Sequence, residues 1–110
     1  MCAPYLDRVK ERLEELDRTV PLDYVHQKEF LEAVEVATKN GLYVPLVFNT
    51  GGYDRVATLK LLEGVFDIYM PDFKFWDSQI AENSCQAGDY PQVARRALAE
   101  MHRQVGDLQI

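Results

Sequence analysis

Apolar residues recur at helical spacing in the first part of the chain and predict two helices there. The first helix is expected over about residues 4–17, and the second over about residues 24–40. The apolar positions of the first are Tyr5, Val9, Leu13 and Leu16. Those of the second are Val25, Phe30, Leu31, Val34 and Ala37. Asn40-Gly41 indicates a stop after the second helix, because glycine takes the left-handed conformation at little cost.

Two short segments with almost no alternating polar residues predict strands that are covered on both faces. They run from Val44 to Phe48 and from Val65 to Met70, and Pro45 favours the first residue of a strand or an edge. Further helices are expected over about residues 54–62, 77–83 and 89–106. Because helices separate the two strands, we expect parallel pairing with a right-handed crossover.

The predicted fold is therefore α/β, with too few strands to satisfy a sheet. Two strands that are apolar on both faces rarely form a stable sheet without further partners. We expect the outer edges to be covered by another copy of the chain or by a swapped element, or else the chain to be part of a larger sheet. A dimer or larger homo-oligomer follows from the first alternative.

Composition narrows the class of protein. The 110 residues fit one domain, and the net charge of -6 argues against nucleic acid as a partner, because phosphate binding needs a basic surface. No apolar run reaches the roughly 20 residues of a membrane span and no signal peptide is visible, so the expected location is the cytoplasm. Cys2 and Cys85 lie far apart, so neither a disulfide scaffold nor a self-contained metal site is indicated.

A polar cluster follows each predicted strand. Asn49-Thr50-Gly51-Gly52 follows the first and Asp72-Phe73-Lys74 the second. Ligands of parallel α/β sheets bind beyond the carboxyl ends of the strands. A carboxylate and an ammonium two residues apart suit a zwitterion, or a cation together with an anion. The structural alternatives are a tight turn for the glycines and a surface ion pair for Asp72 and Lys74.

Three blocks of the sequence carry a family resemblance: residues 47–54, residues 67–74, and residues 89–106. They read VFNTGGYD, DIYMPDFK and DYPQVARRALAEMHRQVG. Over about residues 30–108 the chain resembles the middle of a radical S-adenosylmethionine protein, and is similar to relatives of pyruvate formate-lyase activating enzyme.

The resemblance implies a fragment of a partial (β/α)6 barrel. It also implies S-adenosylmethionine and an iron-sulfur cluster of the 4Fe-4S type as the cofactors of the parent family, which generates a radical and abstracts hydrogen. Asn49, Thr50, Asp72 and Lys74 would face the cofactor. We expect their side chains in one shared cavity, with the methionyl carboxylate on Lys74 and a cation or water among the other three.

The chain departs from that family in its cysteines. The cluster motif C-x-x-x-C-x-x-C is absent from these residues, as are the glycine-rich strand and the last strands of the barrel. Residues 1–22 match nothing in the family and form an N-terminal helix of unclear origin. We therefore interpret residues 1–110 as one truncated barrel segment that binds no cofactor firmly and is inactive alone. Two alternatives stay open: a small α/β binding or interaction module, and half of a split enzyme with a cluster-bearing partner chain.

Overall fold

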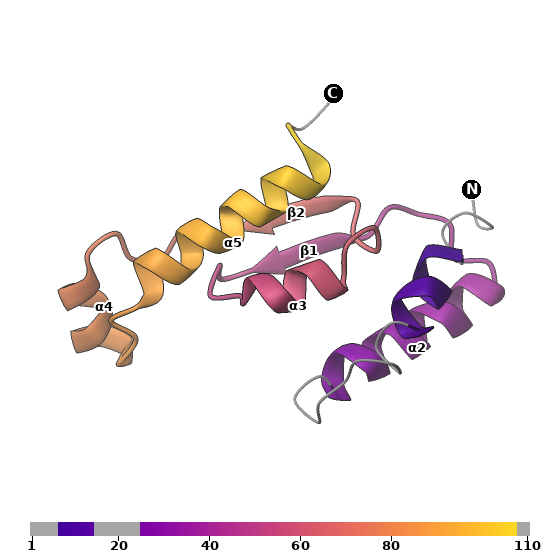
Figure 1. Cartoon of the computed structure of the whole chain (residues 1–110), viewed down its shortest axis with the longest axis horizontal. Coiled ribbons are helices and arrows are strands. Elements are labelled where there is room, and N and C mark those ends of the chain that lie inside the picture. The colour runs from indigo at the N-terminus through magenta and orange to yellow at the C-terminus, as the bar shows by residue number, and fades with distance from the viewer. Residues whose placement is uncertain (1–6, 15–24, 108–110) are drawn as a thin grey trace.

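The computed structural model describes residues 7–14 and 25–107. The first of these ranges is helical, and the remaining elements follow in the order helix, strand, helix, strand, helix, helix (Figure 1). These elements are α2 (Val25–Lys39), β1 (Val47–Thr50), α3 (Val56–Leu61), β2 (Ile68–Pro71), α4 (Ser78–Cys85) and α5 (Tyr90–Val105). The predicted mixed α/β order is confirmed, although the expected ends of the first helix lie outside the described residues. No helix within the described ranges has the length and apolar character needed to cross a membrane.

The two strands are parallel neighbours, as predicted. Val47 pairs with Ile68 and Thr50 pairs with Pro71, and α3 forms part of the connection between the strands. These strands make a two-stranded sheet in the described part of the chain, so a mixed α/β fold is established and a barrel is not.

The first strand begins later than the sequence predicts. It starts at Val47, two residues after Pro45, and not at Val44. Proline lacks the N–H that a ladder needs, and the next amide, of Leu46, bonds to the Asp67 carboxylate at 3.0 Å. The N–H of Leu46 is thus held by a side chain, while its carbonyl oxygen already accepts backbone bonds from Asp67 and Ile68.

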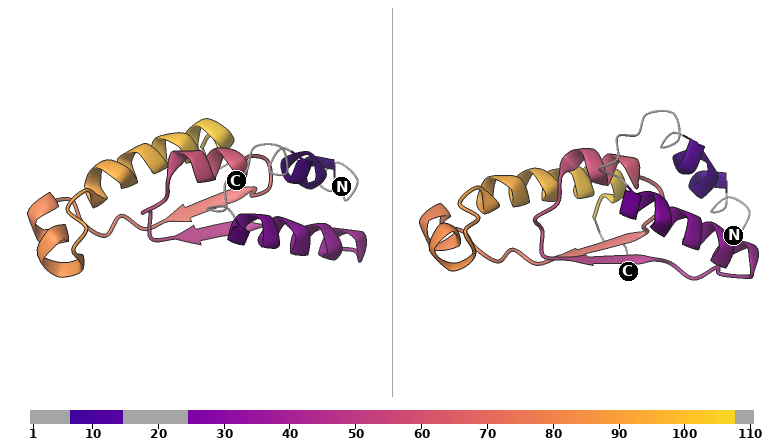
Figure 2. Two further views of the ribbon diagram at one scale, coloured as in Figure 1. Left: turned by 60° about the horizontal axis from the view of Figure 1, so that its bottom comes forward. Right: turned by 90° about the horizontal axis from the view of Figure 1, so that it is seen from below.

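Helices cover one face of the sheet only. Phe48 and Tyr69 pack against the apolar cores formed with α2, α3 and α5. The opposite face is open: Val47 is 45% exposed and Met70 54% exposed. The prediction that both strand faces are covered is therefore wrong within the described chain. Figure 2 shows α3 and α5 together on the same side of the two strands.

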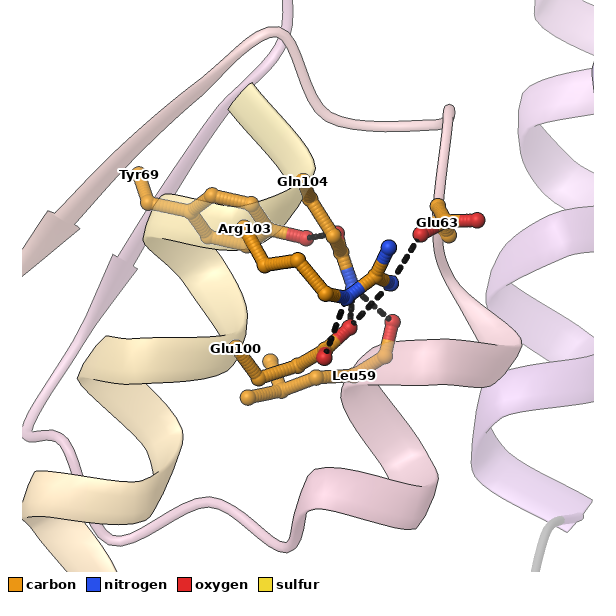
Figure 3. A network of polar contacts seen from close by, with 6 residues as sticks. All are labelled: Leu59, Glu63, Tyr69, Glu100, Arg103 and Gln104. Carbon is orange, nitrogen blue, oxygen red and sulfur yellow. Dashed lines mark hydrogen bonds and ion pairs between the residues drawn. The ribbon is translucent and has the colours of Figure 1, made fainter. Parts of the chain in front are cut away.

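A polar network fastens α5 to the connection before β2 (Figure 3). Glu100, only 6% exposed, accepts hydrogen bonds from Arg103 Nε at 2.8 Å and from Gln104 Nε2 at 2.7 Å. Arg103 also pairs with Glu63, and the Tyr69 hydroxyl donates to Gln104 at 2.5 Å. The hydrogen bonds from Arg103 lower the pKa of Glu100 to about 2, and burial raises the pKa of Tyr69 to about 12. The carboxylate is therefore charged at neutral pH and orients Arg103 and Gln104, which in turn bind Glu63 and the Leu59 carbonyl outside α5.

Candidate functional site

Parallel pairing brings the two predicted polar clusters side by side. The ladder continues one residue beyond β2, because Asp72 N–H donates to Thr50 O at 2.9 Å. Both loops therefore leave the sheet at the same end, as expected for the carboxyl ends of adjacent parallel strands. This adjacency is the basis of the candidate site.

The hydroxyl of Tyr90 ties the two loops together. It donates to Gly51 O at 2.5 Å and accepts the Lys74 N–H at 2.7 Å, while Asp72 O lies 3.1 Å away. Tyr90 is the first residue of α5 and is 5% exposed. A buried hydroxyl that satisfies backbone groups of both loops fixes their relative position.

Gly52 allows the loops to approach this closely. Its φ is +84°, and a Cβ at this position would lie 2.8 Å from Asp72 O. Both the left-handed backbone and the contact exclude an ordinary side chain. At the neighbouring Gly51 a Cβ would lie 3.9 Å from Lys74 Cε, so the lysine side chain passes over bare backbone.

Asp72 and Lys74 form an exposed ion pair. Lys74 Nζ lies 3.0 Å from Asp72 Oδ2, and more than half of each side chain is exposed. Along an extended backbone Asp72 shares a face with Met70, the partner of Asn49 in the strand register. Asn49, Asp72 and Lys74 are thus brought to the open face of the sheet. The pair itself contributes little to stability, so its charges are available to a ligand.

Thr50 is used differently from the other three predicted residues. Its hydroxyl donates to Asp54 Oδ2 at 2.6 Å and accepts the Gly52 N–H at 3.1 Å. These bonds close the turn after β1. Thr50 therefore shapes the loop, and Asp54 serves as its acceptor.

The cavity beside β1 does not contain all four of the predicted site residues. The structure has an open cavity of about 510 Å³ beside β1, which Asn49 lines and Thr50, Asp72 and Lys74 do not. This cavity lies under α2, and its walls come from His26, Gln27, Phe30, Val47, Phe48, Asn49, Asp54, Thr58, Leu62 and Phe66. This cavity therefore does not bring the four side chains together, and the binding role of the four residues stays a prediction.

Sequence reasoning missed the part that Tyr53, Asp89 and Tyr90 play around this site. Asp89 lies at the start of α5, where aspartate commonly caps a helix, but its side chain makes no capping bond and accepts the Tyr53 hydroxyl at 2.5 Å instead. The hydrogen bond to this carboxylate raises the pKa of Tyr53. The Tyr53 and Tyr90 rings stack with centroids 5.7 Å apart. The tyrosine at the start of a predicted helix was the available signal, but its partners lie 16 and 39 residues earlier.

The described residues do not fit the iron-sulfur cluster that the resemblance implies. They contain one cysteine, the exposed Cys85, and no group of three side chains of metal-ligating type lies together in residues 7–14 and 25–107. Cys2 lies outside the described residues. A 4Fe-4S cluster needs several thiolates held close together, so no step through such a cluster is derived for this chain.

Comparison with known proteins gives one distant relative. A protein of Methanocaldococcus jannaschii, described as uncharacterized, is 31% identical over 71 residues, which are 64% of this chain and 20% of that protein. The chain thus spans about a fifth of the length of the relative it matches. No protein-family model and no solved structure matches the chain. The resemblance to radical S-adenosylmethionine proteins therefore remains a prediction.

Proposed function

We propose that this chain is a segment of a radical S-adenosylmethionine protein of the activating-enzyme type. In this proposal it retains part of the surface that binds S-adenosylmethionine and lacks the residues that generate the radical. The adjacency of the two strand-end loops, held by the Tyr90 hydroxyl, is the observation that carries the proposal. A family resemblance in which both loops carry the matching residues supports it.

The chemistry of the loops suits the methionyl end of S-adenosylmethionine. That end is a zwitterion, with one carboxylate and one ammonium group. Lys74 would bind the carboxylate and Asp72 the ammonium, so that the ligand replaces the exposed ion pair with two pairs of its own. The bare backbone at Gly51 and Gly52 leaves room for the ligand beside Lys74.

Binding by these groups alone is expected to be weak. The two charges are solvent-exposed, and exposed charge pairs are worth about 0–1 kcal/mol each. We expect a dissociation constant in the millimolar range, equivalent to about -4 kcal/mol. The chain would then hold and orient the ligand at the strand ends. It would not catalyse the cleavage of S-adenosylmethionine that the parent family carries out.

Calorimetric titration of S-adenosylmethionine into the 110-residue chain tests the proposal. Lys74→Met should weaken binding by up to about fivefold, because it removes the charge that binds the carboxylate, and an exposed pair is worth at most about 1 kcal/mol. Lys39→Met is the matched control. Lys39 is 52% exposed and pairs with Glu35, whereas Lys74 is 54% exposed and pairs with Asp72. Equal affinity in the two variants, or no binding to the unmodified chain at millimolar ligand, would contradict the proposal.

A further inference from the structure

The two edges of the sheet differ in what they offer to another strand. Leu46 O and Thr50 O accept bonds from β2, so the intervening Val47 and Asn49 direct their backbone groups to the outer edge of β1. On β2 the amides of Ile68 and Asp72 point toward β1, and the outward positions are Tyr69 and Pro71.

This difference favours the addition of a further strand to the outer edge of β1 and not to that of β2. Pro71 has no N–H, and a proline on an edge is a common device against further pairing. The outer edge of β1 has an N–H and a C=O at both Val47 and Asn49, and no strand within the described residues pairs with it. Four backbone groups are therefore available on a strand of four residues.

Helix α2 is placed to cover a strand at that edge. Figures 1 and 2 show α2 on the side of β1 away from β2. The cavity of about 510 Å³ lies there, with Phe30 from α2, Phe48 from β1 and Phe66 on its walls. Phe30 stacks on Phe66 and is still 38% exposed. An apolar side chain from an added strand would contact the aromatic side chains that line this cavity.

One of the residues that line this cavity carries an unsatisfied polar atom. Gln27 Oε1 is buried and has no hydrogen-bond partner. Most buried side-chain oxygens are paired, so an unpaired one beside an open cavity indicates that a donor is missing. An incoming polypeptide supplies N–H donors as well as apolar side chains.

We propose that the outer edge of β1 binds an extended segment of a different polypeptide, which adds a third strand beneath α2. Every second side chain of the segment is apolar and enters the cavity. A second copy of this chain fits poorly, because each copy carries its own α2 beyond its β1 edge, and the two helices would compete for one space. The residues of the relative that match make up only a fifth of it, so its corresponding region lies within a much larger body of chain. This inference does not depend on the proposed ligand.

A synthetic peptide tests the proposal on the 110-residue chain. The probe is about eight residues long, somewhat more than an average strand, with valine and threonine alternating between terminal lysines. We expect it to shift the amide signals of Val47 and Asn49 in nuclear magnetic resonance spectra and to slow their hydrogen exchange. The same peptide with a central proline should have no effect, because it cannot complete the ladder.

A matched pair of variants separates the two edges. Val47→Lys should weaken the peptide about tenfold, because lysine on an edge opposes pairing, and Met70→Lys should leave the affinity unchanged. Both residues lie on the open face and are about half exposed, so neither change disturbs the core. Equal loss in both variants, or peptide-induced shifts at Tyr69, would overturn the proposal. Shifts at Val47 that grow with protein concentration before peptide is added would assign the edge to a second copy and overturn it too.

Discussion

Replacing Tyr90 with phenylalanine should destabilise the chain through the loss of one oxygen. The hydroxyl donates to Gly51 O and accepts from Lys74 N–H, at 2.5 and 2.7 Å. Phenylalanine keeps the ring, which packs with Phe73 and Phe75 at centroid distances of 5.8 and 5.7 Å. The change therefore removes polar contacts while the apolar packing stays.

The magnitude follows from the burial of the groups left behind. Each unpaired buried backbone group costs about 1–3 kcal/mol, and Tyr90 is 5% exposed. Water reaches the outer part of the loops, so we expect about 2 kcal/mol in total, at the lower end of that range for two groups. For a chain of this length such a loss lowers the melting temperature by roughly 10–15 °C.

Thermal unfolding followed by circular dichroism measures this loss, and Tyr53→Phe is the matched control. The Tyr53 hydroxyl makes an equally short bond, 2.5 Å to Asp89, but it lies at an exposed position. Water can replace that bond, so its removal should cost less than about 0.5 kcal/mol. Hydrogen exchange of the Lys74 amide should also accelerate in Tyr90→Phe only. Equal melting temperatures in the two variants, or a Lys74 amide that stays protected in Tyr90→Phe, would refute the reasoning.

Two further predictions concern stability. Gly52→Ala should lower the free energy of unfolding by about 3 kcal/mol, because a Cβ would meet Asp72 O at 2.8 Å; Gly41→Ala, with nothing within 4 Å, should cost only the backbone strain of about 1 kcal/mol. Urea unfolding measures both, and similar losses would show that the contact is unimportant. Glu100→Gln should cost about 2 kcal/mol at neutral pH. Because the folded-state pKa of Glu100 is lowered to about 2 from 4.5, its contribution is present above about pH 4.5 and is lost as the pH falls toward 2. The difference between wild type and variant should shrink over that range, and a constant difference would contradict the assignment.

The order of the elements could be predicted because each depends on nearby residues. Asp77 begins α4 as expected, since its carboxylate accepts the amides of Gln79 and Ile80 two and three residues away. Gly106 follows the last residue of α5. The predicted start of β1 was wrong because Pro45 has no N–H to donate to the ladder. The next amide, of Leu46, donates to the Asp67 carboxylate, 21 residues away.

The candidate site could be predicted only to the level of the two loops. Parallel pairing follows from the helix between the strands, and it places Thr50 next to Asp72. The role of Tyr90 depends on where α5 docks, which no local pattern specifies. Likewise Asp89 has the residue type and position typical of a helix cap, but its carboxylate accepts a hydrogen bond from Tyr53, 36 residues earlier. Competition from distant residues is what the sequence could not reveal.

The most direct test of the proposed function is a map of the amide signals that S-adenosylmethionine perturbs. We predict that millimolar ligand produces its largest shifts at residues 49–54 and 72–74, the two loops that Tyr90 joins, and that Lys74→Met makes these shifts smaller at the same ligand concentration. Largest shifts at Gln27 and Phe30, which line the cavity under α2, would place the ligand elsewhere. Such a result, or the absence of any localised shift, would contradict the claim that the strand-end loops form the binding surface.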